Sequence, residues 1–125
     1  MLGTEHPDTA TTYNNIALVY QAMGDYDKAL DFNQKAQTIR EKVLGTEHPS
    51  TATTYNNIAG VYQDMGDYDK ALEFALKAEH IWETVFGADH PHTRSVCSLL
   101  AVLYHETGDM EKAQEYKMKA GIPLE

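Results

Sequence analysis

The side chains with the clearest chemical potential are histidines that recur next to acidic residues. His6, His48 and His90 each follow an Asp or Glu and precede a proline, at a period of 42 residues. Imidazole and carboxylate form a common ligand pair for metal ions. Copies one repeat apart are too distant to share one ion, however, and a histidine before proline is typical of a turn or a helix cap. We therefore predict structural histidines and no metal site, with Asp89, His90 and His92 as the best of the weak metal candidates.

The single cysteine, Cys97, is the other side chain that could do chemistry. A thiol nucleophile needs a base beside it, but His105 lies eight residues along the same expected helix, about 12 Å away by helical rise. Cys97 also stands where the earlier repeats have Tyr13 and Tyr55. We therefore predict a buried structural thiol. Without a glycine-rich phosphate loop or an obvious carboxylate pair, the sequence predicts neither an enzyme nor a cofactor.

Composition narrows the class of partner and the compartment. The chain has 125 residues and a net charge of −9, so phosphate backbones are repelled and nucleic acid is an unfavourable partner. No apolar run approaches the roughly 18 residues that a membrane span needs, and no signal segment precedes the first repeat. A single cysteine suits a reducing compartment. These features predict a cytoplasmic protein with no membrane partner.

One motif sets the organisation of the chain. The run from Leu44 to Pro49 (LGTEHP) also occurs at residues 2–7, and it returns in altered form as FGADHP at residues 86–91. A fixed period of this size indicates one supersecondary unit that is repeated and stacked. Repeats at 3–44, 45–86 and 87–125 account for a single domain spanning 1–125. The first two repeats differ at only 11 of 42 positions.

Each repeat has the pattern of a helix hairpin. Within residues 8–23 five apolar residues share a helical spacing: Tyr13, Ile16, Ala17, Tyr20 and Met23. Spacings of three and four residues place these side chains on one face of a helix. Gly24 and Asp25 end this helix, and a second helical pattern follows over 26–44. Because the connection is so short, the two helices must be antiparallel. The expected fold is all-α: an α-solenoid of three stacked antiparallel helix hairpins, the last ending early at Gly121.

The repeat motif resembles a known family. Its elements are Tyr13-x-x-Ile16-Ala17-x-x-Tyr20, then Gly24-Asp25-Tyr26, Ala29 and Ala36, and together they are similar to the tetratricopeptide repeat (TPR). The period of 42 residues and the Gly-Thr-Glu-His-Pro turn resemble the kinesin-light-chain type. This resemblance implies a right-handed superhelix, a segment of a longer array, and a scaffold or adaptor that binds partner peptides in a concave groove lined by the first helices.

The groove side of the first helices is expected about a quarter to a half turn from their apolar face. By the resemblance, the groove residues are Thr11, Asn14, Asn15, Leu18, Gln21, Thr53, Asn56, Asn57, Gly60, Gln63, Ser98, Val102 and His105. Asn14 and Asn56, one hairpin apart, would form an amide ladder for an extended peptide backbone. Alternatively, these asparagines are simply solvated on an exposed helix face. We call the listed groove residues the groove strip.

The groove strip predicts the chemistry of the ligand. Gly60 would open a pocket where the first repeat has Leu18. Asp64 and Glu106 near the ends of the strip favour a neutral to basic peptide. Related domains that grip C-terminal carboxylates carry Lys or Arg here, whereas Arg94 is the only Lys or Arg on a first helix of this chain. The resemblance therefore argues against a carboxylate clamp.

Two questions stay open at the level of sequence. The alternative function is self-assembly, in which uncapped apolar faces at both ends join copies into an end-to-end or domain-swapped homo-oligomer without a dedicated peptide ligand.

Trp82 replaces Arg40 of the first repeat, and it either packs in the extended part of the second helix or marks an exposed patch.

Overall fold

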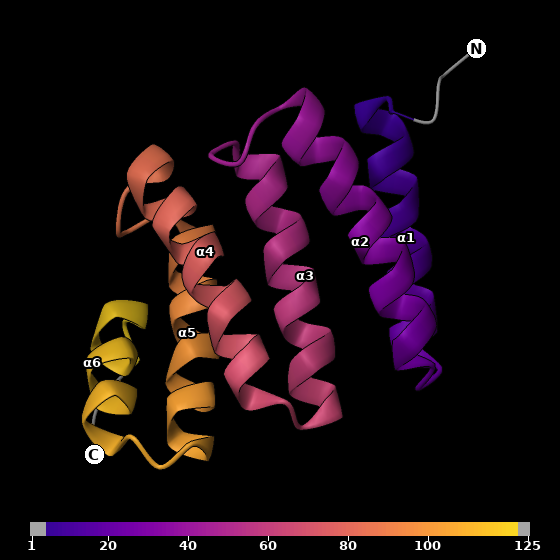
Figure 1. Cartoon of the computed structure of the whole chain (residues 1–125). Coiled ribbons are helices and arrows are strands. Elements are labelled where there is room, and N and C mark those ends of the chain that lie inside the picture. The colour runs from indigo at the N-terminus through magenta and orange to yellow at the C-terminus, as the bar shows by residue number, and fades with distance from the viewer. Residues whose placement is uncertain (1–4, 123–125) are drawn as a thin grey trace.

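The computed structural model describes residues 5–122, which form six α-helices and no strands. The helices are α1 (Pro7–Ala22), α2 (Tyr26–Val43), α3 (Pro49–Met65), α4 (Tyr68–Phe86), α5 (Pro91–Glu106) and α6 (Met110–Ala120). They pair into three antiparallel hairpins that stand side by side in chain order (Figure 1). The all-α solenoid is confirmed, and the expected bounds of α1 and α2 differ from the observed ones by one residue at most.

The three first helices begin in the same way. The Nδ1 atoms of His6, His48 and His90 each accept a hydrogen bond from the backbone N–H two residues on, at 3.0, 3.0 and 3.1 Å. A proline follows each histidine in the first turn, where its missing N–H costs nothing. The histidines therefore satisfy backbone donors at the helix starts, as an N-cap does. The capping role predicted from the sequence is confirmed.

The turn inside each hairpin is equally regular. Gly24 and Gly66 both adopt φ of +81°, a left-handed conformation that favours glycine. Asp25 and Asp67 follow them, and each side chain accepts a bond from the backbone N–H three residues later, at 3.3 and 3.2 Å. A glycine stop followed by an aspartate N-cap thus reverses the chain within a few residues, which forces the antiparallel pairing.

The core is distributed unequally along the array. Alanines stand where the helices of each hairpin approach closely, and all are at most 2% exposed. These are Ala17, Ala59, Ala101, Ala29, Ala71 and Ala113. A large hydrophobic cluster extends from α3 to α6, whereas the first hairpin has a small cluster of Ala10, Ala36 and Ile39, with Tyr13 against it. Most of the apolar burial therefore lies around the second and third hairpins.

Candidate functional site

The residues expected to line the groove fall into three groups by exposure. Exposed are Thr11, Asn15, Leu18, Thr53, Val102 and His105; partly exposed are Gln21, Asn56, Asn57, Gly60, Gln63 and Ser98; buried is Asn14. Most of the strip is therefore accessible to a partner, but its members do not share one environment.

The structure corrects the expected position of Asn14, which does not line an open groove. This residue is 4% exposed, and its Oδ1 accepts bonds from Arg40 Nη1 at 2.6 Å and from Thr54 Oγ1 at 3.0 Å. Its Nδ2 donates to Asn33 Oδ1 at 2.9 Å. Because repeat two covers this side of α1, both the oxygen and the nitrogen of the amide are bonded inside the protein. The expected ladder of Asn14 and Asn56 on an open surface is therefore wrong.

The surroundings of Gly60 include a contact between the first two repeats. Gln21 Nε2 donates to Asp64 Oδ2 at 2.9 Å, which links the ends of α1 and α3. A Cβ atom built on Gly60 would lie 3.5 Å from that same nitrogen. The Gln21 amide therefore forms one wall beside the partly exposed Gly60, and the pocket at this glycine stays a prediction.

The accessible part of the strip mixes aliphatic and amide groups. Leu18 is 48% exposed and Val102 is 46% exposed, although both side chains are apolar. Asn15 is exposed next to the buried Asn14, and Asn57 is partly exposed one repeat later. Such a surface can hold the apolar side chains of a peptide and pair with its backbone groups.

Three of the expected residues come together in the third repeat. A cavity of about 330 Å³ is lined by Ser98, Ala101, Val102, His105, Glu106, Lys117 and Ile122. Sequence reasoning missed Lys117 and Ile122, because they lie at and beyond the end of the last second helix. The signal that could have found them is the early stop at Gly121, which adopts a left-handed φ of +77°.

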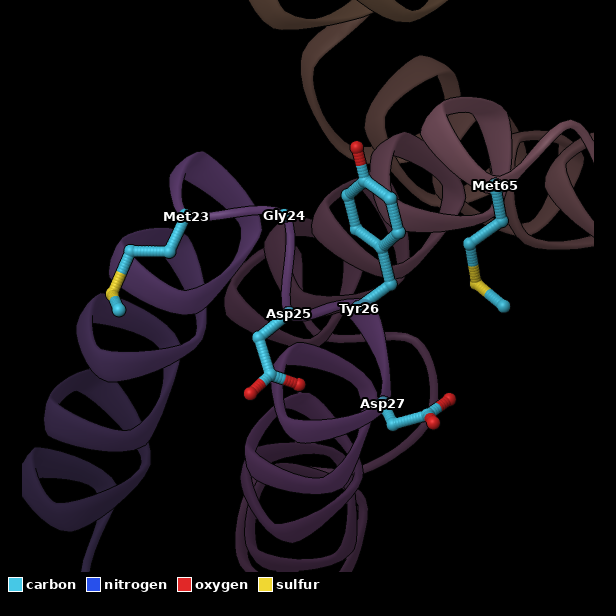
Figure 2. A pocket seen from close by; sticks show the side chains of 6 residues that line it. All are labelled: Met23, Gly24, Asp25, Tyr26, Asp27 and Met65. Atoms are coloured by element: carbon cyan, nitrogen blue, oxygen red, sulfur yellow. The ribbon is translucent and has the colours of Figure 1, made fainter.

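A separate cavity of about 430 Å³ opens at the hairpin-turn edge of the array. Figure 2 shows Met23 and Met65 on either side of the α1–α2 turn, with Tyr26 between them. An equivalent cavity of about 360 Å³ lies at the next turn, beside Tyr68. The carboxylate of Asp25 is already used to cap α2, so this edge offers fewer polar groups than its composition suggests.

The junction of the first two hairpins holds a buried cation. Arg40 is 7% exposed, and burial lowers the pKa of its guanidinium. Besides Asn14, it donates to the Ser50 carbonyl at 2.9 Å, to Thr54 Oγ1 at 2.9 Å and to Thr11 Oγ1 at 3.1 Å. All of these acceptors are neutral groups of the chain itself. Arg40 therefore holds α2 against α1 and α3, a role that the sequence pattern did not indicate.

The corresponding position at the next junction is Trp82, which is 4% exposed. Its Nε1 donates to the Pro49 carbonyl at 3.2 Å, and its ring centroid lies 5.1 Å from that of His92. Of the two interpretations left open by the sequence, packing in the extended second helix is confirmed and the exposed patch is wrong.

Cys97 lies in the same apolar cluster and is 2% exposed. Burial, followed by the nearby Glu79 carboxylate, raises the pKa of the thiol to about 11. A thiol that stays protonated is a poor nucleophile. The buried structural thiol predicted from the sequence is confirmed.

Residues 5–122 contain no group of three or more His, Cys, Asp and Glu side chains that could bind a metal ion. Within the same range, no helix is long and apolar enough to cross a membrane.

Stacked helix hairpins with this turn chemistry define the class of protein: an α-solenoid built from helical repeats. The model of the tetratricopeptide repeat family matches residues 8–81 and 50–120, so the chain belongs to the tetratricopeptide repeat family. Proteins with this fold are generally scaffolds rather than enzymes, and the fold suggests a protein–protein interaction scaffold.

Solved structures are similar over nearly the whole chain. BtubC (BKLC) from P. vanneervenii is 27% identical with a TM-score of 0.85, and the match covers 92% of this chain and 46% of that one. A putative kinesin light chain from Podosopora anserina with nearly identical TPR-like repeats is also 27% identical with a TM-score of 0.85, over 96% of this chain and 57% of that one. The kinesin-light-chain-like subclass is thus confirmed. No curated protein was found to be similar.

The chain spans about half the length of these solved relatives, 46% and 57%.

Proposed function

We propose that this chain is an adaptor module that binds an extended peptide segment of a partner protein along its first helices. The observation that carries the proposal is the exposed strip of mixed chemistry on successive first helices. Leu18 and Val102 supply apolar contacts, and Asn15 and Asn57 supply amides between them. The proposed contact set is the expected groove strip without Asn14, whose amide already bonds to Asn33, Arg40 and Thr54.

The ligand that fits this surface is neutral to basic. The chain carries 19 acidic and 10 basic side chains, and Asp64 and Glu106 lie at the ends of the strip on α3 and α5. A peptide with Lys or Arg next to aliphatic residues would gain attraction without losing contact area. The proposed setting is the cytoplasm, with no cofactor, no nucleic acid and no membrane required for binding.

A selection from a random peptide library tests the proposal. The wild-type chain is compared with a Leu18→Asp/Val102→Asp variant and with a Val43→Asp/Val85→Asp control, whose valines are 46% and 50% exposed on the second helices. We expect a common motif to be enriched by the wild type and the control and to be lost with the first variant. Equal enrichment by all three chains, or no enrichment by any, would overturn the proposal.

Self-association is a second candidate function, and one observation favours it. Val19 is 59% exposed, whereas Val61 at the same position of the next, nearly identical repeat is 0% exposed. An apolar side chain that is covered on α3 is thus exposed on α1, where a further copy could cover it.

A further inference from the structure

The outer side of α1 exposes side chains that are buried in both later first helices. Val19 is 59% exposed, but Val61 and Leu103, one and two repeats on, are 0% exposed. Ile16 is partly exposed, but Ile58 is 1% exposed. Since the first two repeats are nearly identical, the difference comes from the preceding hairpin, which covers α3 and has no counterpart against α1 among residues 5–122. We call Ile16 and Val19 the α1 face.

Among residues 5–122, the α5–α6 hairpin exposes the surface that would complement this face. Ala36 and Ala78 are 0% exposed on α2 and α4. Ala120, at the same position of α6, is partly exposed. Ala120 follows Lys117, which lines the cavity of about 330 Å³, by three residues. The partly exposed alanine therefore lies on the same face of α6 as that cavity.

The cavity of about 330 Å³ lies on this same surface. Ser98 and His105 line it, and their counterparts in the first repeat are Asn14 and Gln21. Those counterparts bond to Thr54 and Asp64 of α3, the following first helix, at 3.0 and 2.9 Å. The cavity is thus the empty equivalent of a place that α3 fills at the first junction. We call Ser98, His105 and Ala120 the α5–α6 face.

We propose that a second copy of this chain docks head to tail, with its α1 face on the α5–α6 face of the first copy. The proposal rests on self-association, the second candidate function, and it names the two surfaces and the head-to-tail direction of docking. The argument is continuity: each face is one half of a stacking interface that the chain already forms twice internally. Because the two faces are different surfaces, the contact is heterologous and can repeat from copy to copy.

One residue limits the strength of this contact. Lys117 occupies the position of Asn33 and Ala75, which are 1% and 0% exposed at the internal junctions. On docking, its ammonium group must stay in water while its aliphatic stem lies along the interface. Replacing Lys117 by the alanine that the second repeat has at this position should therefore tighten the association, by at least about tenfold in the dissociation constant.

Sedimentation equilibrium over a wide range of protein concentration tests whether the copies dock head to tail. Val19→Glu blocks the α1 face and Ala120→Glu blocks the α5–α6 face, and neither side chain is buried in the single chain. We expect the wild type to self-associate and each variant alone to be a monomer. An equimolar mixture of the two variants retains one intact pair of faces, so it should form dimers and nothing larger.

Two controls keep this result interpretable. Val85→Glu changes a valine that is 50% exposed on the central repeat and should associate like the wild type. Circular dichroism should show unchanged helix content in every variant. A wild type and a Lys117→Ala variant that both stay monomeric, a single-face variant that associates as strongly as the wild type, or a mixture that stays monomeric would each overturn the proposal. Peptide selection on the Val19→Glu monomer reports on the adaptor function separately.

Discussion

The two junctions between hairpins place different chemistry at equivalent positions of one fold. The exchanged pairs are Asn33 with Ala75, Arg40 with Trp82, and Thr54 with Val96. The first junction is a buried hydrogen-bond network centred on Arg40, and the second is an apolar cluster centred on Trp82. The comparison teaches that the shape of the hairpins specifies how they stack. The energy that stabilises a junction can come either from buried hydrogen bonds or from apolar packing.

The difference should make the two junctions unequal in strength. Burying a guanidinium costs desolvation energy that hydrogen bonds to neutral groups only partly offset, and Arg40 Nε is a buried donor without a partner among the described residues. The Trp82 junction instead buries a large aromatic surface and satisfies its single N–H. We therefore expect the first hairpin to separate from the array more easily than the third.

The largest effect is expected for Trp82→Ala. Removing a large, 4% exposed side chain leaves a void between α4 and α5 and should lower the free energy of unfolding by about 3–5 kcal/mol. Urea denaturation followed by circular dichroism measures the loss. A loss below about 1 kcal/mol would mean that the second junction does not depend on apolar packing.

Arg40→Ala should cost less, about 1–3 kcal/mol in the same assay. This variant removes the charge with its desolvation cost, but it leaves Asn14 and Thr54 without their shared donor. A cost equal to or above that of Trp82→Ala would reverse the proposed order of the two junctions.

The comparison becomes sharpest when one junction is converted into the other. An Asn33→Ala/Arg40→Trp/Thr54→Val variant gives the first junction three residues of the second, and it also removes the side chains that bond to the buried Asn14 amide. Replacing a buried ionic group by well-packed apolar residues is often neutral or stabilising, whereas a buried amide without partners costs stability, so we expect the variant to lie within about 1 kcal/mol of the wild type and above Arg40→Ala. Thermal unfolding provides the measurement. A variant less stable than Arg40→Ala would show that the two junctions differ in shape as well as chemistry.

The smallest effect concerns Glu79, which is 8% exposed in the second junction. Burial raises the pKa of its carboxyl group, with Lys119 opposing part of the shift. When a carboxyl group has a raised pKa in the folded state, the free energy of unfolding of the protein falls as the pH rises through that pKa. Glu79→Gln, which restores the residue type of Gln37 in repeat one, should therefore raise Tm at neutral pH. The difference should shrink on mild acidification; a difference that widens would contradict this sign.

Much of the fold could be predicted because it depends on local patterns that occur three times. The Gly-Asp stops and the His-Pro starts fix the helix ends, and the spacing of the apolar residues fixes which helices pair. The site was harder, because Asn14 and Asn15 are adjacent and polar, yet one is buried and the other exposed. Which of them meets the next hairpin depends on the angle at which hairpins stack, and the periodicity of a single helix does not contain that angle.

Trp82 shows the same limit. Its contacts are the Pro49 carbonyl and the His92 ring, which come from the starts of α3 and α5. A position on a helical wheel gives the direction of the side chain but not the groups that other helices bring to it.

Amide hydrogen exchange on the intact chain tests most directly whether the two junctions differ in strength. If the Arg40 junction is the weaker one, the amides of α1 and α2 exchange through a partial opening, while those of α3, α4 and α5 exchange only on global unfolding. Equal protection of all five helices, or an earlier opening of α5 than of α1, would contradict that claim.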